Sequence, residues 1–506
     1  MWQRFTLYDS RVIAHYLGTL MLFLAAALCA PFFVAAVMQE WGPAARYLLS
    51  IGVALILASI LRMAHVAPGQ LDNRQAIAVT ALAWLVLAVI GAIPLYLSGH
   101  FGSYLDAFFE SMSGWTTTGA SLAQDLDHLS IADNMWRFTM QMVGGQGVIV
   151  IALSLGMFGT AVDSSLYSSE GRSEHVVPNI MQTTKFIVRF SVLFITIGVV
   201  IMTCLCLWLG MDGPRAFFNG LWLSIASFNT SGMTAMSTGI LYYHCGPLEM
   251  VAMVLILLGS INFTLHNEVW RGRIYHFVKD IEVVTLAVWL GVAVLVFTLA
   301  TCAAGVYDDL PTLLRRSVFT VVVAFSSTGF QTITANQLTT VISSGALLIL
   351  IFCMAMGGSA GSTTGGIKAF RVGILLKELV AYIKEVLAPD SARQVVMYYH
   401  VGRHPLTNSL VRANLAVFLL FCAAFLVTTI ATVAFGYDAA EAMFESVSMA
   451  SNIGMSVGII QPGMPDVLKL LYIFDMWAGR LEYVALIALL TSVIMSMKPR
   501  KKVSRG

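Results

Sequence analysis

Charge is scarce in this chain of 506 residues: Asp, Glu, Lys and Arg make up 11% of it, against about 25% in soluble domains. Hydrophobic residues account for 58%, and the mean hydropathy is +0.81. A composition this apolar excludes a soluble protein and leaves no basic surface of the kind that binds nucleic acid. It predicts a protein that lies within a membrane over most of its length.

Several chemical signatures are also missing. The seven cysteines include no Cys-x-x-Cys pair, so we expect neither a metal-binding cysteine cluster nor a disulfide framework. The sequence has no Gly-x-x-x-x-Gly-Lys-Ser/Thr loop for nucleotide phosphates. Its apolar runs hold too few His, Asp and Glu residues for a catalytic site. We therefore expect no enzyme and no cofactor, and a polytopic membrane enzyme remains only a remote alternative.

Long apolar runs are what the sequence has in abundance. Runs of about 18 or more apolar residues are typical of membrane-spanning helices. Ten are predicted, near 14–38, 46–64, 75–98, 135–160, 186–210, 246–265, 283–304, 340–356 with its continuation, 411–435 and 467–496. With the N-terminus placed inside, 22 of the 29 Lys and Arg residues fall in inside loops. By the positive-inside rule, this bias predicts that both termini are cytoplasmic.

A short phrase that ends in Gly occurs four times between these runs. It reads Trp115-Thr-Thr-Thr-Gly119, Asn229-Thr-Ser-Gly232, Ser326-Ser-Thr-Gly329 and Ser451-Asn-Ile-Gly454. Irregular backbone at membrane depth is tolerated only where it is buried in protein or lines a wet cavity. One copy could be a bent helix, but four copies favour an ion filter, in which carbonyl oxygens replace the hydration shell of a cation. We expect these oxygens from the residues that precede each Gly, namely Thr117, Thr118, Thr230, Ser231, Ser327, Thr328, Asn452 and Ile453.

The spacing of the phrases predicts a four-fold architecture. Acids or Pro at helix-starting positions, such as Asp106, Pro214 and Asp438, predict a short helix before each phrase. The fold class expected is therefore an all-α polytopic membrane protein with ten transmembrane helices. Its parts are an N-terminal two-helix unit (1–70) and four helix–pore loop–helix repeats (71–175, 176–280, 281–400 and 401–506) around one pseudo-four-fold pore. The last repeat ends in a basic cytoplasmic tail.

A Gly-rich segment interrupts the apolar run that follows the third phrase. It includes Gly357, Gly358, Gly361, Ser362, Thr363, Thr364, Gly365 and Gly366. A helix is expected to break there, because Gly is a poor helix former. The segment could be a hinge or a close helix crossing. The alternative that we favour is a flexible gate on the cytoplasmic side of the filter.

A charged group, Arg480, lies within the last apolar run. Charges at membrane depth are costly and therefore indicate function. Helical spacing predicts that Asp475 and Glu482 share a face and that Arg480 points away from both. Arg480 could face the pore axis below the filter as a barrier to cation leak. It could also form a salt bridge with an acid of another repeat.

These motifs together resemble the Trk/Ktr/HKT superfamily of potassium transporters, and the two extra N-terminal helices are similar to its TrkH-type rather than its KtrB-type members. The resemblance implies a homodimer in a bacterial inner membrane, with one potassium pore per protomer. Gly119, Gly232, Gly329 and Gly454 would mark the filter, 357–366 the gate loop and Arg480 the electrostatic barrier.

The resemblance also implies a partner and a substrate. A cytoplasmic nucleotide-binding ring of the TrkA type would dock on the inner face and control opening. Plant relatives that prefer sodium carry Ser in place of the first filter Gly, so Gly119 favours potassium. The polar stretch 368–410 could contact such a partner or anchor the chain to membrane lipid. A sodium- or proton-coupled symporter on the same scaffold remains the second hypothesis.

Overall fold

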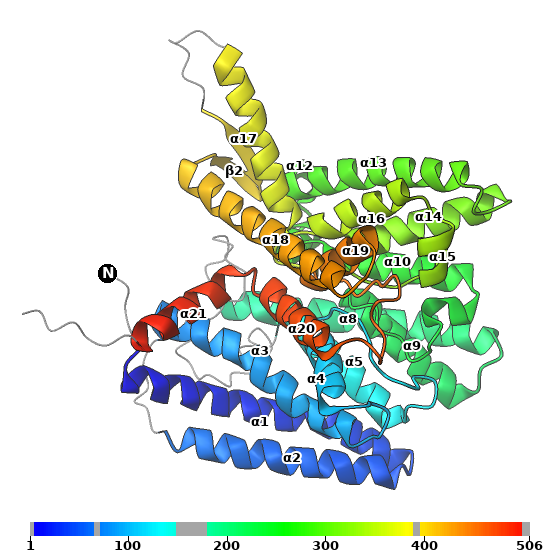
Figure 1. Cartoon of the computed structure of the whole chain (residues 1–506), viewed down its shortest axis with the longest axis vertical. Coiled ribbons are helices and arrows are strands. Elements are labelled where there is room, and N and C mark those ends of the chain that lie inside the picture. The colour runs from blue at the N-terminus through cyan, green and yellow to red at the C-terminus, as the bar shows by residue number, and fades with distance from the viewer. Residues whose placement is uncertain (1–4, 65–70, 148–179, 388–394, 498–506) are drawn as a thin grey trace, which may run out of the picture.

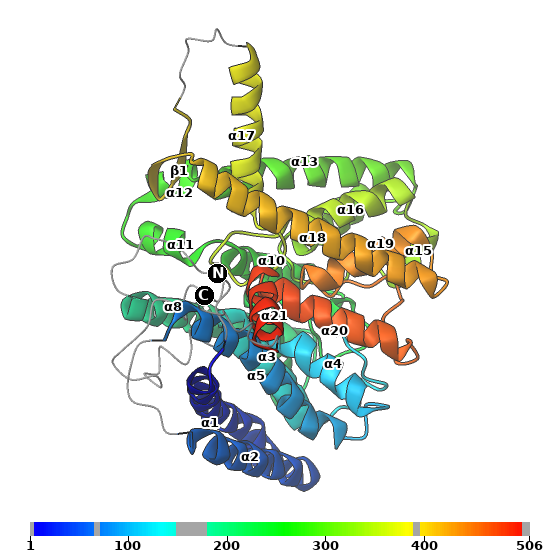
Figure 2. The ribbon, with the colours of Figure 1, turned by 60° about the vertical axis from the view of Figure 1, so that its left-hand side comes forward.

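Long apolar helices form much of the outside of the molecule. In the computed structural model, which describes residues 5–64, 71–147, 180–387 and 395–497, six helices are long and apolar enough to cross a membrane. They are α1 (Leu7–Val37), α2 (Trp41–Arg62), α3 (Asn73–Tyr96), α8 (Ile180–Trp208), α13 (Ile281–Ala303) and α18 (Asn408–Ala434). Helices α1 and α2 lie side by side at one edge of the bundle, next to α3 and α5 (Figures 1 and 2).

Four shorter helices each fold back against the long helix that precedes them. They are α4 (Tyr104–Trp115), α9 (Gly213–Phe228), α14 (Leu310–Phe325) and α19 (Ala439–Ala450), which pack on α3, α8, α13 and α18 respectively. Caps fix where each begins. Ser103, Asp309 and Asp438 accept backbone N–H bonds at three of the starts, and Pro214 opens the fourth.

The helices that follow the four Gly phrases are also short. They are α5 (Ile131–Gln146), α10 (Gly246–Ser260), α16 (Ser344–Met356) and α20 (Asp466–Arg480). At 1.5 Å per residue, helices of 13–16 residues are shorter than the roughly 30 Å hydrocarbon core of a bilayer. Helix α10 meets α11 (Phe263–Trp270) at a bend of 99°, and α20 meets α21 (Val484–Met497) at 108°.

The expected count of ten transmembrane helices is not confirmed. The structure has six continuous candidate spans, or eight when each bent pair is counted as one, within the described residues. The predicted runs 246–265 and 467–496 are broken because the chain turns at Ile261 and Leu481. The run 340–356 is a 13-residue helix, and the predicted run 135–160 is described only as far as Gly147. Hydropathy counts apolar residues and does not register a turn between them.

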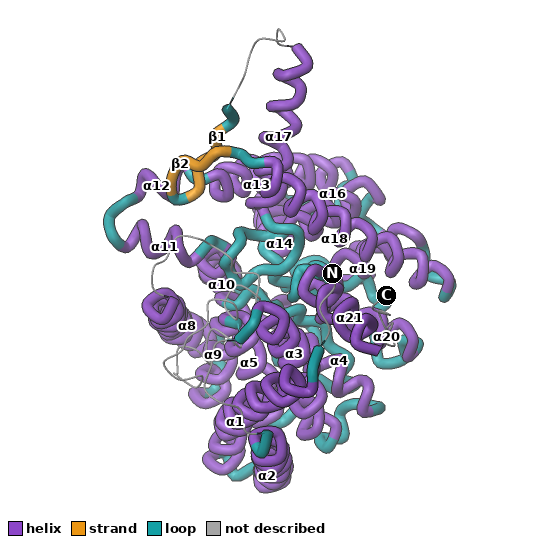
Figure 3. The backbone as a smooth tube through the Cα atoms, turned by 90° about the vertical axis from the view of Figure 1, so that its left-hand side faces the viewer, coloured by secondary structure: helices purple, strands orange, loops and turns teal. Residues whose placement is uncertain are grey.

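The remaining elements lie at the two ends of the bundle. They are the 3₁₀ helix η1 (Gly239–Tyr243), α12 (Ile274–Lys279), α15 (Ala335–Thr340), α17 (Ala369–Leu387) and the strands β1 (Met397–His400) and β2 (Gly402–Pro405). The two strands form an antiparallel hairpin in which His400 pairs with Gly402. Helix α17 projects away from the bundle (Figure 1), and loop segments run through the middle of the helices (Figure 3).

Candidate functional site

The four short helices α4, α9, α14 and α19 end in the same way. The second residue after each helix is left-handed: φ is 56° at Thr117, 49° at Thr230, 56° at Ser327 and 54° at Asn452. The next N–H then turns back to a carbonyl five residues earlier, as in a Schellman motif. These bonds join Thr118 to Ser113 (2.9 Å), Ser231 to Ala226 (2.9 Å), Thr328 to Val323 (3.0 Å) and Ile453 to Ser448 (2.8 Å). A left-handed backbone conformation costs about 1–2 kcal/mol at a residue other than Gly. Because this conformation occurs at four such residues, we infer that the surrounding structure enforces it.

The Gly of each phrase also has a positive φ, of 91° at Gly119, 68° at Gly232, 81° at Gly329 and 79° at Gly454. A side chain would be strained there, and it would also have no room. A Cβ built on each Gly would lie closer than 3.0 Å to the backbone carbonyl oxygen of the next phrase. The colliding pairs are Gly119 with Ser231, Gly232 with Thr328, Gly329 with Ile453 and Gly454 with Thr118.

These contacts close a ring. The first phrase touches the second, the second the third, the third the fourth, and the fourth returns to the first. Each touching oxygen belongs to the residue that precedes a Gly. All four glycines also line one cavity of about 900 Å³, which we call the vestibule. The sequence-predicted residues of all four phrases therefore lie together around a single centre.

The wall of the vestibule mixes apolar and polar groups, and its described residues include no carboxylate. Ser121, Ser237, Gln331 and Thr334 contribute to its wall, together with backbone, and the positively ionisable residues are Arg137 and His244. No Asp or Glu is among its described lining residues. A cation at the ring would therefore meet main-chain and hydroxyl oxygens rather than acidic side chains.

Two buried carboxylates hold the chain that leaves the ring. Glu110 accepts the N–H of Leu122 at 3.0 Å and pairs with Arg137 at 2.7 Å. Glu445 stands nine residues before Gly454, as Glu110 does before Gly119, and it accepts the N–H of Val457 at 3.0 Å. Leu122 and Val457 each stand three residues after their Gly. The bonds of these two acids to the outgoing chain could not be predicted from the sequence.

The Gly-rich segment 357–366 lies directly against the ring. A Cβ on Gly365 would collide with the carbonyl oxygen of Ser451, and the Thr363 hydroxyl is 2.9 Å from that of Thr230. Thr363 also donates to the carbonyl of Gly259 at the end of α10 (2.9 Å). The helix breaks at Gly357, as the sequence predicted, and the segment contacts the second and fourth phrases rather than forming a simple helix crossing.

Arg480 joins this segment to another helix end. One guanidinium nitrogen donates to the carbonyl of Thr363 at 3.0 Å, and the other donates to the carbonyl of Gly144 at 2.6 Å. The expected shared face of Asp475 and Glu482 is wrong, because α20 ends at Arg480 and Glu482 has a φ of 55° outside the helix. Asp475 instead accepts a bond from Thr428, and Glu482 pairs with Arg371.

Acidic residues connect the Gly-rich segment to the hairpin β1–β2. Glu282 accepts the N–H of Ala360 at 2.7 Å. Asp280 caps the start of α13, accepts the N–H of Val401 at 3.0 Å and contacts His400 at 3.1 Å. A continuous set of contacts therefore runs from this end of the molecule to the ring.

The chain also matches known membrane transport proteins in sequence. A model of the family TrkH, described as a cation transport protein, matches residues 46–498. The chain belongs to the TrkH family of cation transport proteins. It is a transporter-family protein rather than an enzyme, which removes the remote alternative of a membrane enzyme.

Named relatives support this family assignment. The chain is 33% identical over 427 residues to an uncharacterized cation transporter of Methanocaldococcus jannaschii, covering 84% of each chain. It is 27% identical over 496 residues to the Trk system potassium uptake protein TrkH of Escherichia coli K12, covering 95% of this chain and 98% of the relative. Its fold is similar to the crystal structure of the potassium transporter TrkH from Vibrio parahaemolyticus, with a TM-score of 0.81 and 24% identity over 95% of this chain and 98% of the other.

Proposed function

We propose that this TrkH-family chain is the potassium-selective ion-translocating subunit of an uptake system. The observation that carries the proposal is the closed ring of Gly119, Gly232, Gly329 and Gly454 on the floor of one vestibule. Carbonyl oxygens held at fixed positions around one centre can replace the water of a dehydrating cation. The names of the curated relatives, several of which are potassium uptake proteins, support potassium as that cation.

The proposed filter comprises the residues predicted from the sequence. They are Thr117, Thr118, Gly119, Thr230, Ser231, Gly232, Ser327, Thr328, Gly329, Asn452, Ile453 and Gly454. The four short helices that precede them direct their C-terminal ends toward the ring, and a helix C-terminus carries about half a negative charge. Because the phrases differ in side chains, the four-fold symmetry is approximate.

Rubidium flux into proteoliposomes, competed by potassium and by sodium, tests the filter. Gly119→Ser is expected to lower the preference for potassium over sodium by about 10-fold or more, because the new side chain collides with the Ser231 carbonyl. A 10-fold loss corresponds to about 1.4 kcal/mol of discrimination between the two ions. Gly210→Ser is the matched control, since Gly210 also has a positive φ (86°) but no atom within 4 Å of a built Cβ. Unchanged selectivity in the Gly119 variant would contradict the proposed filter.

We further propose that residues 357–366 and Arg480 form the gate. The support is the position of Thr363, which bonds to the second phrase and to Arg480 at once. A segment so rich in Gly can change conformation at low steric cost. In the closed form, a guanidinium below the ring opposes the leak of cations.

The charge bias of the loops supports an orientation with both termini in the cytoplasm of the cell and the vestibule outside. The resemblance supports a homodimer in a bacterial inner membrane, regulated by a TrkA-type nucleotide-binding ring. The hairpin β1–β2 is then on the cytoplasmic face. Its contacts with Asp280, and those of Glu282 with Ala360, offer a route by which a docked partner could act on the gate.

Coupled symport with sodium or protons is the alternative. The absence of Asp and Glu from the described vestibule lining favours a pore over a coupled mechanism. Rubidium flux with and without a proton gradient, and with and without sodium, distinguishes the two. Flux that follows the rubidium gradient alone supports a pore, whereas accumulation driven by either other gradient supports symport.

A further inference from the structure

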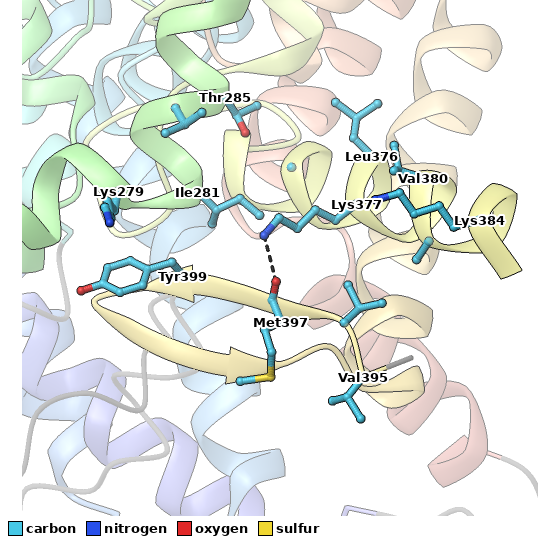
Figure 4. A pocket seen from close by; sticks show the side chains of 14 residues that line it. Lys279, Ile281, Thr285, Leu376, Lys377, Val380, Lys384, Val395, Met397 and Tyr399 are labelled. Atoms are coloured by element: carbon cyan, nitrogen blue, oxygen red, sulfur yellow. Dashed lines mark hydrogen bonds between the residues drawn. The ribbon is translucent and has the colours of Figure 1, made fainter. Parts of the chain in front are cut away.

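A second cavity lies between α13, α17 and β1 and shares no lining residue with the vestibule. Its volume is about 570 Å³, within the range of small-molecule sites. Figure 4 shows side chains from these three elements facing a common groove. Its apolar wall includes Ile281, Val284, Leu376, Val380 and Val395.

Three lysines are spaced along this groove. Lys279 lies at one end, Lys377 in the middle and Lys384 at the other end (Figure 4). The Nζ atom of Lys377 donates to the Met397 carbonyl at 3.0 Å, and that of Lys279 to the Tyr275 hydroxyl at 2.9 Å. Neither contact neutralises a charge. No Asp or Glu is among the described lining residues, so the ionisable side chains of the groove wall are basic.

The periodicity of α17 explains why apolar and basic groups share this groove. Lys377 and Lys384 are seven residues apart and therefore lie on one face of the helix. Leu376 and Val380, four apart, form the adjacent strip and are each 50% exposed. The face that α17 turns to the groove thus combines an apolar strip with a basic one.

The groove also lies where membrane-spanning helices begin. Lys279 ends α12 and is separated by Asp280 alone from Ile281, the first residue of the apolar helix α13, and β2 ends shortly before α18 starts at Asn408. In the orientation proposed above, this is the cytoplasmic surface of the membrane. Clusters of basic side chains at that level are suited to anionic lipid head groups.

We infer that this groove binds an anionic phospholipid of the inner leaflet. The lysines hold the phosphate-bearing head group, and an acyl chain covers the apolar wall. A second copy of this chain is a poorer occupant, because a two-fold contact through the same patch would bring two lysine strips together. The site is independent of ion selectivity and rests on the proposed function only for the side of the membrane.

The test is binding of phosphatidylglycerol to the purified full-length protein. Native mass spectrometry counts retained lipid, and thermal unfolding in phosphatidylcholine nanodiscs with increasing phosphatidylglycerol gives the affinity. The combined variant Lys279→Gln, Lys377→Gln, Lys384→Gln is expected to bind roughly 100-fold more weakly. The control replaces three exposed cations outside the groove, Lys185, Arg271 and Arg412, by Gln.

Lys384→Gln alone covers the case in which the combined variant fails to fold, because Lys384 is exposed at the surface of α17. It is expected to bind roughly 5-fold more weakly. Equal lipid retention by the groove and control variants would overturn the proposal. So would equal stabilisation by inorganic phosphate, or crosslinking of Val395→Cys to its counterpart in a second copy. Rubidium selectivity is measured separately, so a failed lipid site leaves the filter hypothesis untouched.

Discussion

At the scale of single residues, the two buried acids of the ring differ in what balances them. Glu110 forms an ion pair with the fully buried Arg137, which also donates to the carbonyl of Thr234. Glu445 is equally buried, but within the described part of the chain it accepts from backbone N–H groups and from the Ser456 hydroxyl. Both carboxylates therefore accept an equivalent N–H bond from the chain that leaves the ring, but their electrostatic surroundings differ.

We expect Glu110→Gln to destabilise the protein far more than Glu445→Gln. The first change leaves the Arg137 guanidinium buried without its counter-charge, which costs about 3–5 kcal/mol. The second keeps an acceptor for Val457 and removes no described ion pair, so about 1 kcal/mol or less is expected. Thermal unfolding of both variants in the same detergent measures the difference. Equal losses of stability would contradict the role assigned to the ion pair.

At the scale of elements, three glycines lie near the ends of α5, α10 and α20, the helices that follow three of the Gly phrases. These glycines determine how closely the helices approach the ring. A Cβ on Gly144, Gly259 or Gly479 would collide with the last carbonyl of the short helix in its own quarter, at Trp115, Phe228 and Ala450 respectively. Each such Gly stands one or two residues before its helix ends. The close approach and the break in the helix are therefore parts of one arrangement.

Gly259→Ala is expected to disturb the ring although it lies on a helix. The new methyl group would displace the end of α9 and press on the Thr363 hydroxyl, so both reduced thermal stability and altered rubidium-to-sodium selectivity are expected. Gly291→Ala on α13 is the control, because no atom lies within 4 Å of its built Cβ. Alanine there should be neutral or stabilising by about 1 kcal/mol. A Gly259 variant that behaves like the Gly291 variant would disprove the packing argument.

The Gly-rich segment should act as a closed barrier at rest. Arg480→Ala removes the bonds to the carbonyls of Thr363 and Gly144, among other contacts, and deletion of 361–364 removes the segment that Arg480 holds. Both changes are expected to raise basal rubidium flux several-fold. Arg412→Ala is the control, since Arg412 is exposed and donates to the Asn408 carbonyl of its own helix. Well-folded variants with unchanged flux would favour a hinge over a gate.

Much of the candidate site could be predicted from the sequence because short contiguous motifs encode it. The ring residues follow from a Gly-containing phrase that recurs four times between apolar runs, and the helix break at Gly357 follows from Gly, Ser and Thr within a run. The breaks after Ser260 and Arg480 could not be found in this way. They accompany close packing between segments far apart in the chain, since Gly259 lies against Phe228 and Gly479 against Ala450.

At the scale of the whole molecule, the orientation in the membrane can be checked directly. The proposed topology places Lys185 inside and Ser237, which lines the vestibule, outside. A membrane-impermeant maleimide should therefore label Ser237→Cys in intact cells, and Lys185→Cys only after permeabilisation. Labelling is compared with the parent chain, because the native cysteines are free in the structure. The reverse pattern would invert the proposed topology and move the groove lysines to the outer surface.

The closed ring of four different phrases has one more consequence. Since a single polypeptide supplies every quarter, one wall of the conduit can be altered while the other three keep their native chemistry. Substitutions could be introduced singly, in adjacent pairs or in opposite pairs, without mixing of subunits. Comparing adjacent with opposite pairs would show whether the four walls contribute additively to ion binding or cooperatively.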